Sequence, residues 1–436
     1  MSHALYSYYG DDFTGSTDVL EGLAVAGVRS VLFLGSPSAD HVRKFHECQA
    51  FGIAGDSRSR TPQWMDEHLP ALFERLRSFG APVVHYKTCS TFDSSPDIGS
   101  IGRAMEIGQR ALSSAFVPVV VAAPHLKRYV VFGNLFAAAG EEIYRIDRHP
   151  TMRQHPVTPM HEADLRLHLG FQTRMRLGLI DLPTLRKGSA AEALTARIAA
   201  GDQGVVFDGT ERHDATTVGH IVWRLARQAP LFAVGSSGLT YGLASAWKAE
   251  NAITGTREAS PAGAVDRLLV MSGSCSPVTE RQIAYALRNG YEGIALDAAA
   301  LADPERRRSI TQEVVSQATR VLQHSGKVIV YSSLGPLPAG TEARGNALGQ
   351  TIGSMLREII QTSGVGRVVL AGGDTSSHAV TQLGLHALTW SGAVEPGAPL
   401  CRAHSDTRAL DGLELVLKGG QVGSEDFFER VRVVSS

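Results

Sequence analysis

Short apolar runs alternate with segments of helical character along most of this chain, as at Val117–Ala122 and, apart from His85, at Val83–Tyr86. Parallel strands that are buried on both faces have this pattern, because helices cover both sides of their sheet. The alternation therefore predicts an α/β fold with largely parallel sheets. The other expected strands are Ala4–Tyr9, Val28–Leu34, Phe51–Ala54, Tyr129–Phe132, Gly204–Phe207, Leu231–Val234, Leu268–Met271, Gly293–Leu296, Val328–Tyr331, Val368–Leu370 and Leu413–Leu417.

One stretch interrupts the alternation. Residues Asn251–Val265 are rich in Ala, Gly, Thr, Ser and Pro and show no apolar periodicity, which is typical of a linker. The chain has 436 residues, enough for two domains. We expect an N-terminal domain over residues 1–250 and a C-terminal domain over residues 265–436.

Composition and charge argue against several classes of protein. The 42 basic residues nearly balance 43 acidic ones, whereas a nucleic-acid-binding protein usually has a basic excess. No apolar run approaches the roughly 20 residues that span a bilayer, and the N-terminus lacks the features of a signal peptide. The four cysteines have no metal-binding spacing, so we interpret them as reduced thiols of a cytoplasmic protein.

The loop after the first expected strand carries two adjacent carboxylates, Asp11 and Asp12. Ligands of open α/β sheets bind beyond the carboxyl ends of the strands, so such loops are candidate sites. Either carboxylate could accept a proton from a substrate hydroxyl or help to hold Mg²⁺. The alternative is a helix cap formed together with Ser16. A phosphatase of the aspartyl-phosphate kind would need Asp-x-Asp, and Gly10 occupies the first position.

Two further loops carry groups that suit a sugar acid. Arg58 follows the strand at Phe51–Ala54 and is either a fork for a carboxylate or a surface arginine. Lys87 opens a loop in which hydroxyls and a carboxylate follow, and it could bind the carboxylate of a polyol acid. The side chains that could bind its hydroxyls are Ser90, Thr91 and Asp93. A solvated Ser/Thr-rich turn is the alternative.

Three other N-terminal segments are less informative. Gly99–Gly102 opens a helix whose N-terminus could receive an anion. Arg145–Met160 is rich in proline, so we expect an irregular segment, and its His149 and His155 suit a structural or lid role better than a metal site. Gly235–Gly238 allows either close approach to a ligand or tight packing of a strand on a helix.

Three loops of the C-terminal half share a strand–loop–helix layout: Ser272–Ser276, Ala371–Ser377 and Lys418–Gly423. Backbone N–H groups and small hydroxyls at helix N-termini form phosphate cradles, so the three loops together predict a bound nucleotide. Each loop alone would also fit a simple small-residue turn. Lys418 could pair with phosphate oxygens, and Asp374 could cap a helix or contact Mg²⁺ or ribose. Neither GxxxxGK[ST] nor GxGxxG occurs in the right context, which argues against a P-loop and a Rossmann fingerprint.

With these motifs in view, the chain resembles the four-carbon acid sugar kinase family over essentially its full length. The motifs, in order, are YYGDDFTGSTD, Ser57-Arg58, KTCSTFDSSPDIGSIG, HPVTPM, GSSG, GSCSPVTERQ, AGGDTSS and LKGGQVG. The resemblance implies an N-terminal sugar-acid domain, a C-terminal nucleotide domain and a ligand cleft between them. It implies transfer of the ATP γ-phosphoryl group to a terminal hydroxyl, with ATP and Mg²⁺ as cofactors. The expected partners are a small-molecule sugar acid and ATP, without nucleic acid or membrane, and a homodimer is left open.

Some motifs depart from those of many relatives. This chain has GSIG where many relatives have GNIG, and KGGQVG where many have KSGNFG, so the glycines are kept. Its STFDS resembles the branch that acts on 3-oxo acids, whereas threonate and erythronate kinases more often resemble STLRG. This favours a 3-oxo-tetronate-type acid, giving the 4-phosphate. The alternatives are threonate, erythronate or 3-oxo-isoapionate as substrate, a non-catalytic sugar-acid sensor, and a lyase or aldolase with a Schiff base at Lys87.

The loops and the resemblance together suggest roles for named residues. Asp12 is the expected catalytic base, although Asp11 is not excluded from that role. The expected substrate-binding residues are Asp11, Arg58, Lys87, Ser90, Thr91 and Asp93. The expected nucleotide-binding residues are Ser274, Gly372, Gly373, Asp374, Thr375 and Gly419. Metal ligands are not assigned.

Overall fold

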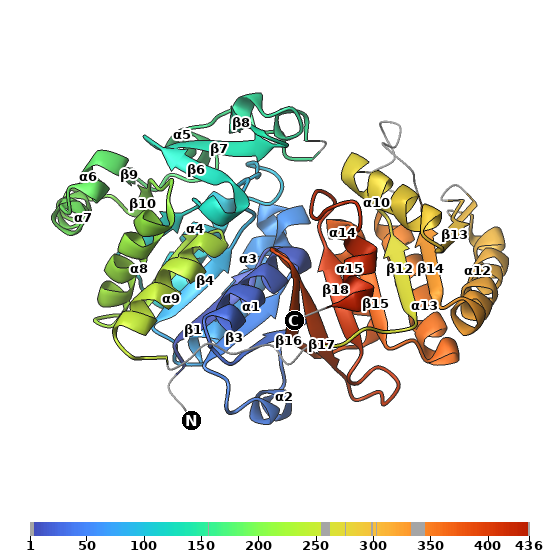
Figure 1. The fold of residues 1–436 in the computed structure, drawn as a ribbon. Helices are drawn as coiled ribbons and strands as arrows, with labels where there is room; N and C mark the ends of the chain where they lie inside the picture. Colours follow the sequence, from blue (N-terminus) through green and yellow to red (C-terminus); the bar gives the residue numbers. More distant parts are fainter. Residues whose placement is uncertain are drawn as a thin grey trace. The chain divides into compact units, whose positions relative to one another are not determined.

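The computed structural model describes residues 4–155, 157–253, 262–274, 276–297, 300–301, 303–332 and 345–434, without the side chains of residues 304, 345–348, 373–376 and 378 (Figure 1). The chain divides into two compact units. The N-terminal unit contains Met1–Asp11, Gly22–Ser30 and Ser38–Arg257, and the C-terminal unit contains Asp12–Glu21, Val31–Pro37 and Glu258–Ser436. Much of the expected linker, residues 254–261, lies outside the described residues.

The N-terminal unit is built on a parallel sheet with the strand order β3-β1-β4-β11-β5-β10-β9. Its strands are β1 (Tyr6–Gly10), β3 (Ala50–Ala54), β4 (Val83–Lys87), β5 (Val117–Val120), β9 (Leu177–Ile180), β10 (Gly204–Phe207) and β11 (Leu231–Gly235). Nearly all of their residues are buried, which explains the continuous apolar runs. The α/β fold with largely parallel sheets is therefore confirmed.

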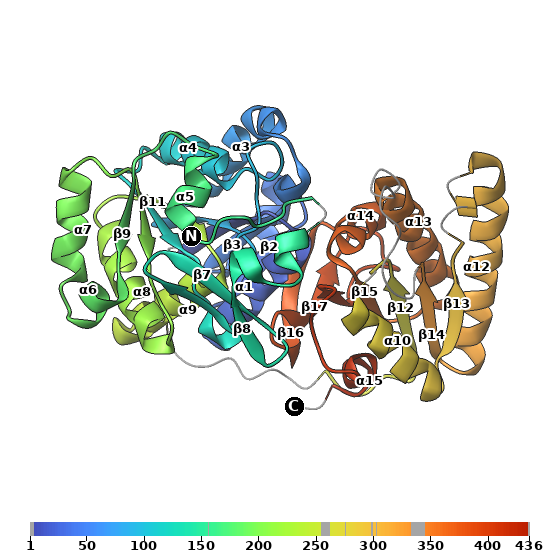
Figure 2. The same ribbon diagram turned by 90° about the horizontal axis from the view of Figure 1, so that it is seen from above.

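Helices cover both faces of this sheet. Figure 2 shows α3 (Pro62–Arg77) and α4 (Ile101–Leu112) on one face and α8 (Arg212–Ala226) and α9 (Ser237–Ala249) on the other. Helices α8 and α9 approach closely at two glycines, because a Cβ on Gly219 would lie 2.1 Å from the Gly242 backbone. The shorter helices of the unit are α2 (Ala39–Lys44), α5 (Leu165–Gly170), α6 (Leu182–Arg186) and α7 (Ala190–Ala199), with 3₁₀ turns at Ser57–Ser59, Pro124–Leu126, Ile146–Arg148 and Met152–Gln154.

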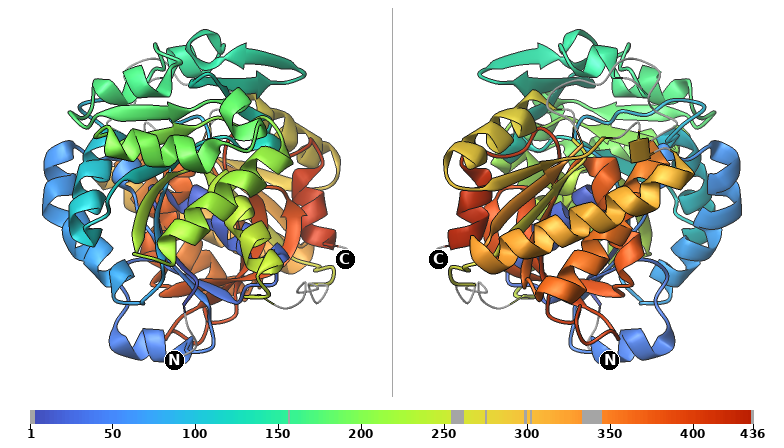
Figure 3. Two further views of the ribbon diagram at one scale, coloured as in Figure 1. Left: turned by 90° about the vertical axis from the view of Figure 1, so that its left-hand side faces the viewer. Right: turned by 90° about the vertical axis from the view of Figure 1, so that its right-hand side faces the viewer.

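A second, small sheet in this unit was not expected. Strands β6 (Arg128–Val131), β7 (Asn134–Ala139) and β8 (Glu142–Arg145) form an antiparallel meander. Figure 3 shows it, in teal, apart from the parallel sheet of its unit. The expected parallel strand at Tyr129–Phe132 was therefore wrong in kind. That run is apolar because one face of the meander packs on the core, where Val130 and Leu135 are fully buried.

The C-terminal unit has a mixed sheet with the order β13-β14-β12-β15-β18-β17-β16-β2. The first five strands are parallel, whereas β17, β16 and β2 are joined by antiparallel pairings. The strands are β2 (Ser30–Phe33), β12 (Leu268–Ser272), β13 (Glu292–Ala295), β14 (Lys327–Tyr331), β15 (Arg367–Ala371), β16 (Ala387–Glu395), β17 (Ala398–His404) and β18 (Glu414–Lys418).

The helices of this unit also lie on two faces of its sheet. Helices α10 (Pro277–Arg288) and α15 (Phe427–Val433) pack on each other, and their apolar residues Ile283, Phe427 and Val431 join the strand residues in one core. Helices α12 (Pro304–His324), α13 (Gly345–Ser363) and α14 (Gly373–Leu383) lie on the other face (Figure 2). Helix α1 (Phe13–Val25) begins in this unit. Within the described part of the chain, no helix is both long and apolar enough to cross a bilayer.

Candidate functional site

The strand ends of the N-terminal unit bring its predicted loops to one edge. Gly10 of β1 is in register with Ala54 of β3 and with Lys87 of β4, and Lys87 is in register with Gly235 of β11. The loops that follow these four strands therefore begin side by side. Two backbone hydrogen bonds connect them, since the Asp11 N–H donates to the Lys87 carbonyl at 3.0 Å and the Arg58 N–H donates to the Asp11 carbonyl at 3.1 Å.

Asp93 is the centre of the predicted sugar-acid loop. Its carboxylate accepts hydrogen bonds from the Arg58 guanidinium at 2.5 Å and from the Thr91 hydroxyl at 2.5 Å. A third comes from the Thr158 hydroxyl at 3.1 Å. Burial would raise the pKa of this carboxyl, but Arg58, His155 and Thr91 together lower it to about 2. Asp93 is therefore an anion that holds Arg58, Thr91 and Thr158 in one arrangement.

The backbone at Phe92 is in the left-handed region, with φ of 56°. A fully buried aromatic residue rarely adopts this conformation, which costs roughly 1–3 kcal/mol. Phe92 lies between Thr91 and Asp93, so its strained backbone helps to set the directions of these two side chains. Such local strain is common at ligand sites.

Lys87 ends β4 and has only 2% of its surface exposed. Burial lowers the pKa of His85, in the same strand, and the charge of Lys87 lowers it further, to about 3. His85 is therefore neutral. Asp11 is also buried, whereas Ser90 is half-buried and reaches solvent. The structure therefore brings Asp11, Arg58, Lys87 and the Thr91–Asp93 segment to neighbouring strand-end loops, with Ser90 at their margin.

Two secondary expectations, those for Gly99–Gly102 and Gly235–Gly238, have structural explanations. Ser100 caps α4 by accepting the Arg103 N–H at 3.2 Å, and the Gly102 N–H donates to Gln172 at 3.1 Å, so two amides of its first turn are already used. A Cβ on Gly235 or Gly238 would lie 1.9 Å from a backbone oxygen, which favours the packing interpretation.

The histidines of the irregular segment organise its backbone. Nδ1 of His149 accepts the Thr151 and Met152 N–H groups at 3.2 Å, and Nδ1 of His155 accepts the Thr158 N–H at 3.1 Å. The structural role is thus supported for both. Sequence reasoning missed Thr158, whose hydroxyl joins this segment to Asp93; the signal was its place in the HPVTPM motif.

In the C-terminal unit, the Gly419–Gln421 loop exposes three backbone amides. The carbonyls on the same three peptide planes are all occupied: that of Lys418 by the Gly372 N–H at 2.8 Å, that of Gly419 by the Val422 N–H at 3.2 Å and that of Gly420 by the Thr279 hydroxyl at 3.0 Å. Among the described residues, the N–H groups of Gly419, Gly420 and Gln421 donate to no protein oxygen. Successive free amides of this kind form an anion-binding nest.

Glycines keep this nest open. A Cβ on Gly420 would lie 2.9 Å from the Ser274 Oγ, and a Cβ on Gly372 would lie 3.2 Å from the Ser274 nitrogen. The φ of Gly372 is +114°, a value that favours glycine. The three C-terminal loops therefore converge on Ser274. The arrangement fits the phosphates of a nucleotide, because a side chain at either glycine would fill the cradle. Gly373 begins α14, and the side chains of Asp374 and Thr375 lie outside the described residues.

Two residues of α10, Thr279 and Gln282, anchor the same loop. Sequence reasoning missed this role, although both residues belong to the GSCSPVTERQ motif. Besides Thr279, Gln282 donates to three consecutive carbonyls, those of Val422, Gly423 and Ser424, at 2.9 to 3.0 Å. The loop therefore has a fixed backbone rather than a free one.

Asp12 belongs with this unit. Its Oδ1 accepts the Gly15 N–H at 2.8 Å, so it caps α1 as the alternative interpretation proposed. The next residues reach the phosphate cradle, since a Cβ on Gly419 would lie 3.8 Å from the Thr14 methyl group. The cap uses Oδ1 of the Asp12 carboxylate.

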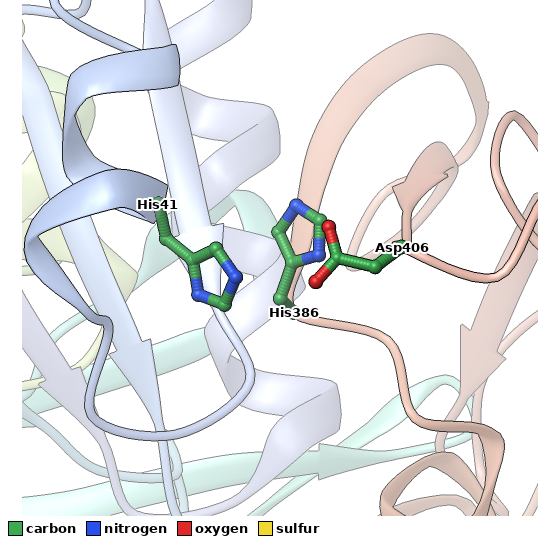
Figure 4. A group of neighbouring side chains, drawn as sticks. All are labelled: His41, His386 and Asp406. Atoms are coloured by element: carbon green, nitrogen blue, oxygen red, sulfur yellow. The ribbon is translucent and has the colours of Figure 1, made fainter.

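His386 and Asp406 are drawn in Figure 4 with ligand atoms within 4.8 Å of one another. His41, also drawn there, belongs to the N-terminal unit. His386 precedes β16 and Asp406 follows β17, whose residue Arg402 pairs with Glu414 at the start of β18. The two side chains thus lie at the edge of the C-terminal sheet opposite to the Gly419–Gln421 loop, away from the phosphate cradle.

The chain matches two family models and several known proteins. Residues 6–243 match a sugar-binding N-terminal domain, and residues 269–428 match a nucleotide-binding C-terminal domain. The chain is 43% identical to a 3-oxo-isoapionate kinase from Paraburkholderia graminis, over 98% of this chain and 94% of that protein. It is 33% identical to a 3-oxo-tetronate kinase from Methylobacterium radiotolerans, over 96% of both. A solved structure from Salmonella typhimurium LT2 is similar with a TM-score of 0.76 and 26% identity over 98% of each chain.

Proposed function

The chain belongs to the four-carbon acid sugar kinase family and is a small-molecule kinase, and we propose that its acceptor is a terminal hydroxyl of a 3-oxo sugar acid. The observation that carries the nucleotide side of the proposal is the nest of three amides at Gly419–Gln421, which suits the phosphates of ATP. The N-terminal unit would bind the acid, and the C-terminal unit would bind the nucleotide.

On the nucleotide side, the nest amides and the Ser274 hydroxyl would bind phosphate oxygens, as charge-neutralising groups do in phosphoryl transfer. Gly372 and Gly373 would let the backbone of the neighbouring loop approach. Mg²⁺ would arrive with ATP, held by phosphate oxygens and water with one or two carboxylates, and it would neutralise phosphate charge.

On the acceptor side, Lys87 would bind the carboxylate of the acid. Arg58 would contribute its guanidinium edges that do not face Asp93, and Ser90 and Thr91 would contact hydroxyl or oxo groups. Because Asp93 fixes both Arg58 and Thr91, the acid would meet an arrangement that exists before it binds.

The transfer itself needs one proton acceptor. The substrate O–H would lose its proton to the Asp12 carboxylate as its oxygen forms a bond to the γ-phosphorus, and the bond from that phosphorus to the bridging oxygen of ADP would break. Asp12 holds the Gly15 N–H with Oδ1, which would keep its carboxylate oriented.

One comparison bears on which acid is used. The identity of 43% to a 3-oxo-isoapionate kinase exceeds the 29% to 33% found for several 3-oxo-tetronate kinases. We therefore place the branched 3-oxo acid first and the 3-oxo-tetronate-type acid second.

The test is ADP release from MgATP with freshly generated 3-oxo-isoapionate, 3-oxo-tetronate, threonate or erythronate. We expect turnover with a 3-oxo acid that is lost in Asp12→Asn and weakened through KM in Lys87→Met. Asp303→Asn is the matched control, because Asp303 caps α12 by accepting the Glu305 N–H. A folded protein that neither binds nucleotide nor turns over any acid would favour a sensor, and turnover of an acid without ATP would favour a lyase.

A further inference from the structure

Lys418 does not point toward the open side of the phosphate cradle. Its side chain has no exposed surface, and its Nζ donates to the Thr279 hydroxyl at 3.0 Å and to the carbonyls of Gly419 and Gly420 at 2.9 and 3.4 Å. An ammonium group has three N–H donors, so these three oxygens account for all of them. A direct bond to a phosphate would require one of them to be given up.

We propose that Lys418 is a positioning residue of the nucleotide site: its ammonium holds the Gly419 and Gly420 carbonyls inward and so keeps the amides on the same peptide planes aimed at phosphate. The inference deepens the proposed function and rests on it, since it assumes that the nest binds a nucleotide.

The planarity of the peptide bond carries this step. In a trans peptide the C=O and the following N–H point in opposite directions. The Gly419 carbonyl faces the Lys418 ammonium, so the Gly420 N–H points away from that ammonium. The Gly420 carbonyl also faces the ammonium, so the Gln421 N–H points away from it as well. These are two of the three amides that have no acceptor among the described residues. Removing the ammonium would leave the Gly419 carbonyl held by the Val422 N–H alone and the Gly420 carbonyl held by the Thr279 hydroxyl alone, so the direction of both amides would be less firmly fixed.

The surroundings of Lys418 make its charge sensitive to a bound anion. It is faced by the Thr279 hydroxyl of α10, by the two glycine carbonyls and by the ring of Phe427 of α15, 5.8 Å away, and within the described residues none of these groups is charged. Burial lowers the pKa of Lys418 to about 7. A phosphate on the outer side of the loop would favour the ammonium form. Nucleotide binding should therefore take up a proton above pH 7.

The test measures MgADP binding by titration calorimetry at pH 8, in two buffers with different ionisation enthalpies. We expect the wild-type protein to take up close to one proton per nucleotide. Lys418→Met keeps the apolar stem and should lose this proton uptake and bind MgADP about tenfold or more weakly. Lys327→Met is the matched control and should leave both quantities unchanged, because Lys327 lies at the start of β14 whereas Lys418 lies at the end of the parallel strand β18.

Thr279 provides a second pair of variants if Lys418→Met does not fold. Thr279→Val removes the hydroxyl that contacts both Lys418 and the Gly420 carbonyl, and should weaken MgADP binding, whereas Thr279→Ser should restore it. Buffer-independent heats in the wild-type protein would overturn the inference, as would unchanged affinity in Lys418→Met. If the wild-type protein bound no nucleotide at all, the proposed function would fail instead.

Discussion

The Arg58 guanidinium and the Asp93 carboxylate join two strand-end loops through a hydrogen bond of 2.5 Å. Arg58 follows β3 and retains 26% exposure of its side chain, whereas the Asp93 side chain has none. The pair is asymmetric: Asp93 is buried and holds the geometry, whereas Arg58 is partly exposed. We regard Asp93 as the organising anion of the acceptor side.

Asp93→Asn should damage both stability and substrate binding. The amide would keep one acceptor oxygen but would replace the other with an N–H donor, and it would remove the negative charge that faces Arg58. Breaking a buried pair in this way costs about 3 kcal/mol or more. Urea unfolding should report that loss, and the KM for the acid should rise. Glu47→Gln, which removes an exposed partner of Arg29, should change neither.

The acid limb of the stability profile should also change in this variant. The pKa of Asp93 is about 2 in the folded protein and about 3.9 when unfolded, so the carboxylate stabilises the fold above pH 4. This contribution is lost as the pH falls from about 4 to about 2. The difference in unfolding free energy between the wild-type protein and Asp93→Asn should therefore shrink across that window. A constant difference would contradict the ionised role of Asp93.

Glu21 should make the C-terminal unit less stable as the pH rises. Burial raises the pKa of Glu21 to about 8, and the nearby Asp18 and Glu395 add to the shift although the Gly397 N–H opposes it. A carboxyl with a raised folded pKa stabilises the fold fully below its unfolded pKa, about 4.3, and loses that contribution as the pH rises to 8.

Glu21→Gln should remove this dependence, because its amide oxygen can still accept the Gly397 N–H. The variant and the wild-type protein should be similar near pH 5, and the variant should be more stable at pH 9 by on the order of 4 kcal/mol. Urea unfolding at pH 5, 7 and 9 measures the difference. Glu47→Gln is the control and should follow the wild-type profile. If the unfolding free energy of Glu21→Gln ran parallel to that of the wild-type protein from pH 5 to 9, Glu21 would be ionised in the fold.

Strands buried on both faces could be predicted from the sequence. Val83–Tyr86 became β4 with only one residue added, because every position of a central parallel strand is buried and the run is apolar apart from His85. Strands β16 and β17 could not be found in this way. In β16, buried positions alternate with more exposed ones, and the strand includes Ser391, Gly392 and Glu395. It pairs in antiparallel fashion, so it has no continuous apolar run.

The site could be predicted residue by residue but not in its internal contacts. The strand-end rule located Lys87, Asp93 and Ser274, because it depends only on the local order of strand and loop. The direction of Lys418 depends on Thr279, which is 139 residues away in the chain. Likewise, Thr158 meets Asp93 across 65 residues. Such long-range partners leave no local pattern, so a lysine expected to meet phosphate was found to be turned inward.

Gly420→Ala should obstruct the phosphate cradle without unfolding the unit. The new methyl group would lie 2.9 Å from the Ser274 Oγ and 3.1 Å from the Ser276 Cβ, so it would occupy the space that the nest leaves open. We expect MgADP to bind at least tenfold more weakly, a loss of about 1.4 kcal/mol. Gly366→Ala is the control, since a Cβ there meets nothing within 4 Å. Equal affinities in the two variants would argue against phosphate binding at this loop.

Asp12 variants can separate the cap of α1 from proton transfer. Asn is about as good an N-cap as Asp, so Asp12→Asn should keep the bond from the Gly15 N–H and alter unfolding by less than about 0.5 kcal/mol. The amide cannot accept the substrate proton, so kcat should fall by roughly 10²- to 10⁴-fold. Asp12→Ala should lose both functions, with a further loss of about 1 kcal/mol of stability. If kcat stayed near the wild-type value in Asp12→Asn but fell in Asp12→Ala, Asp12 would be assigned to the cap alone, and Asp11 would become the candidate base.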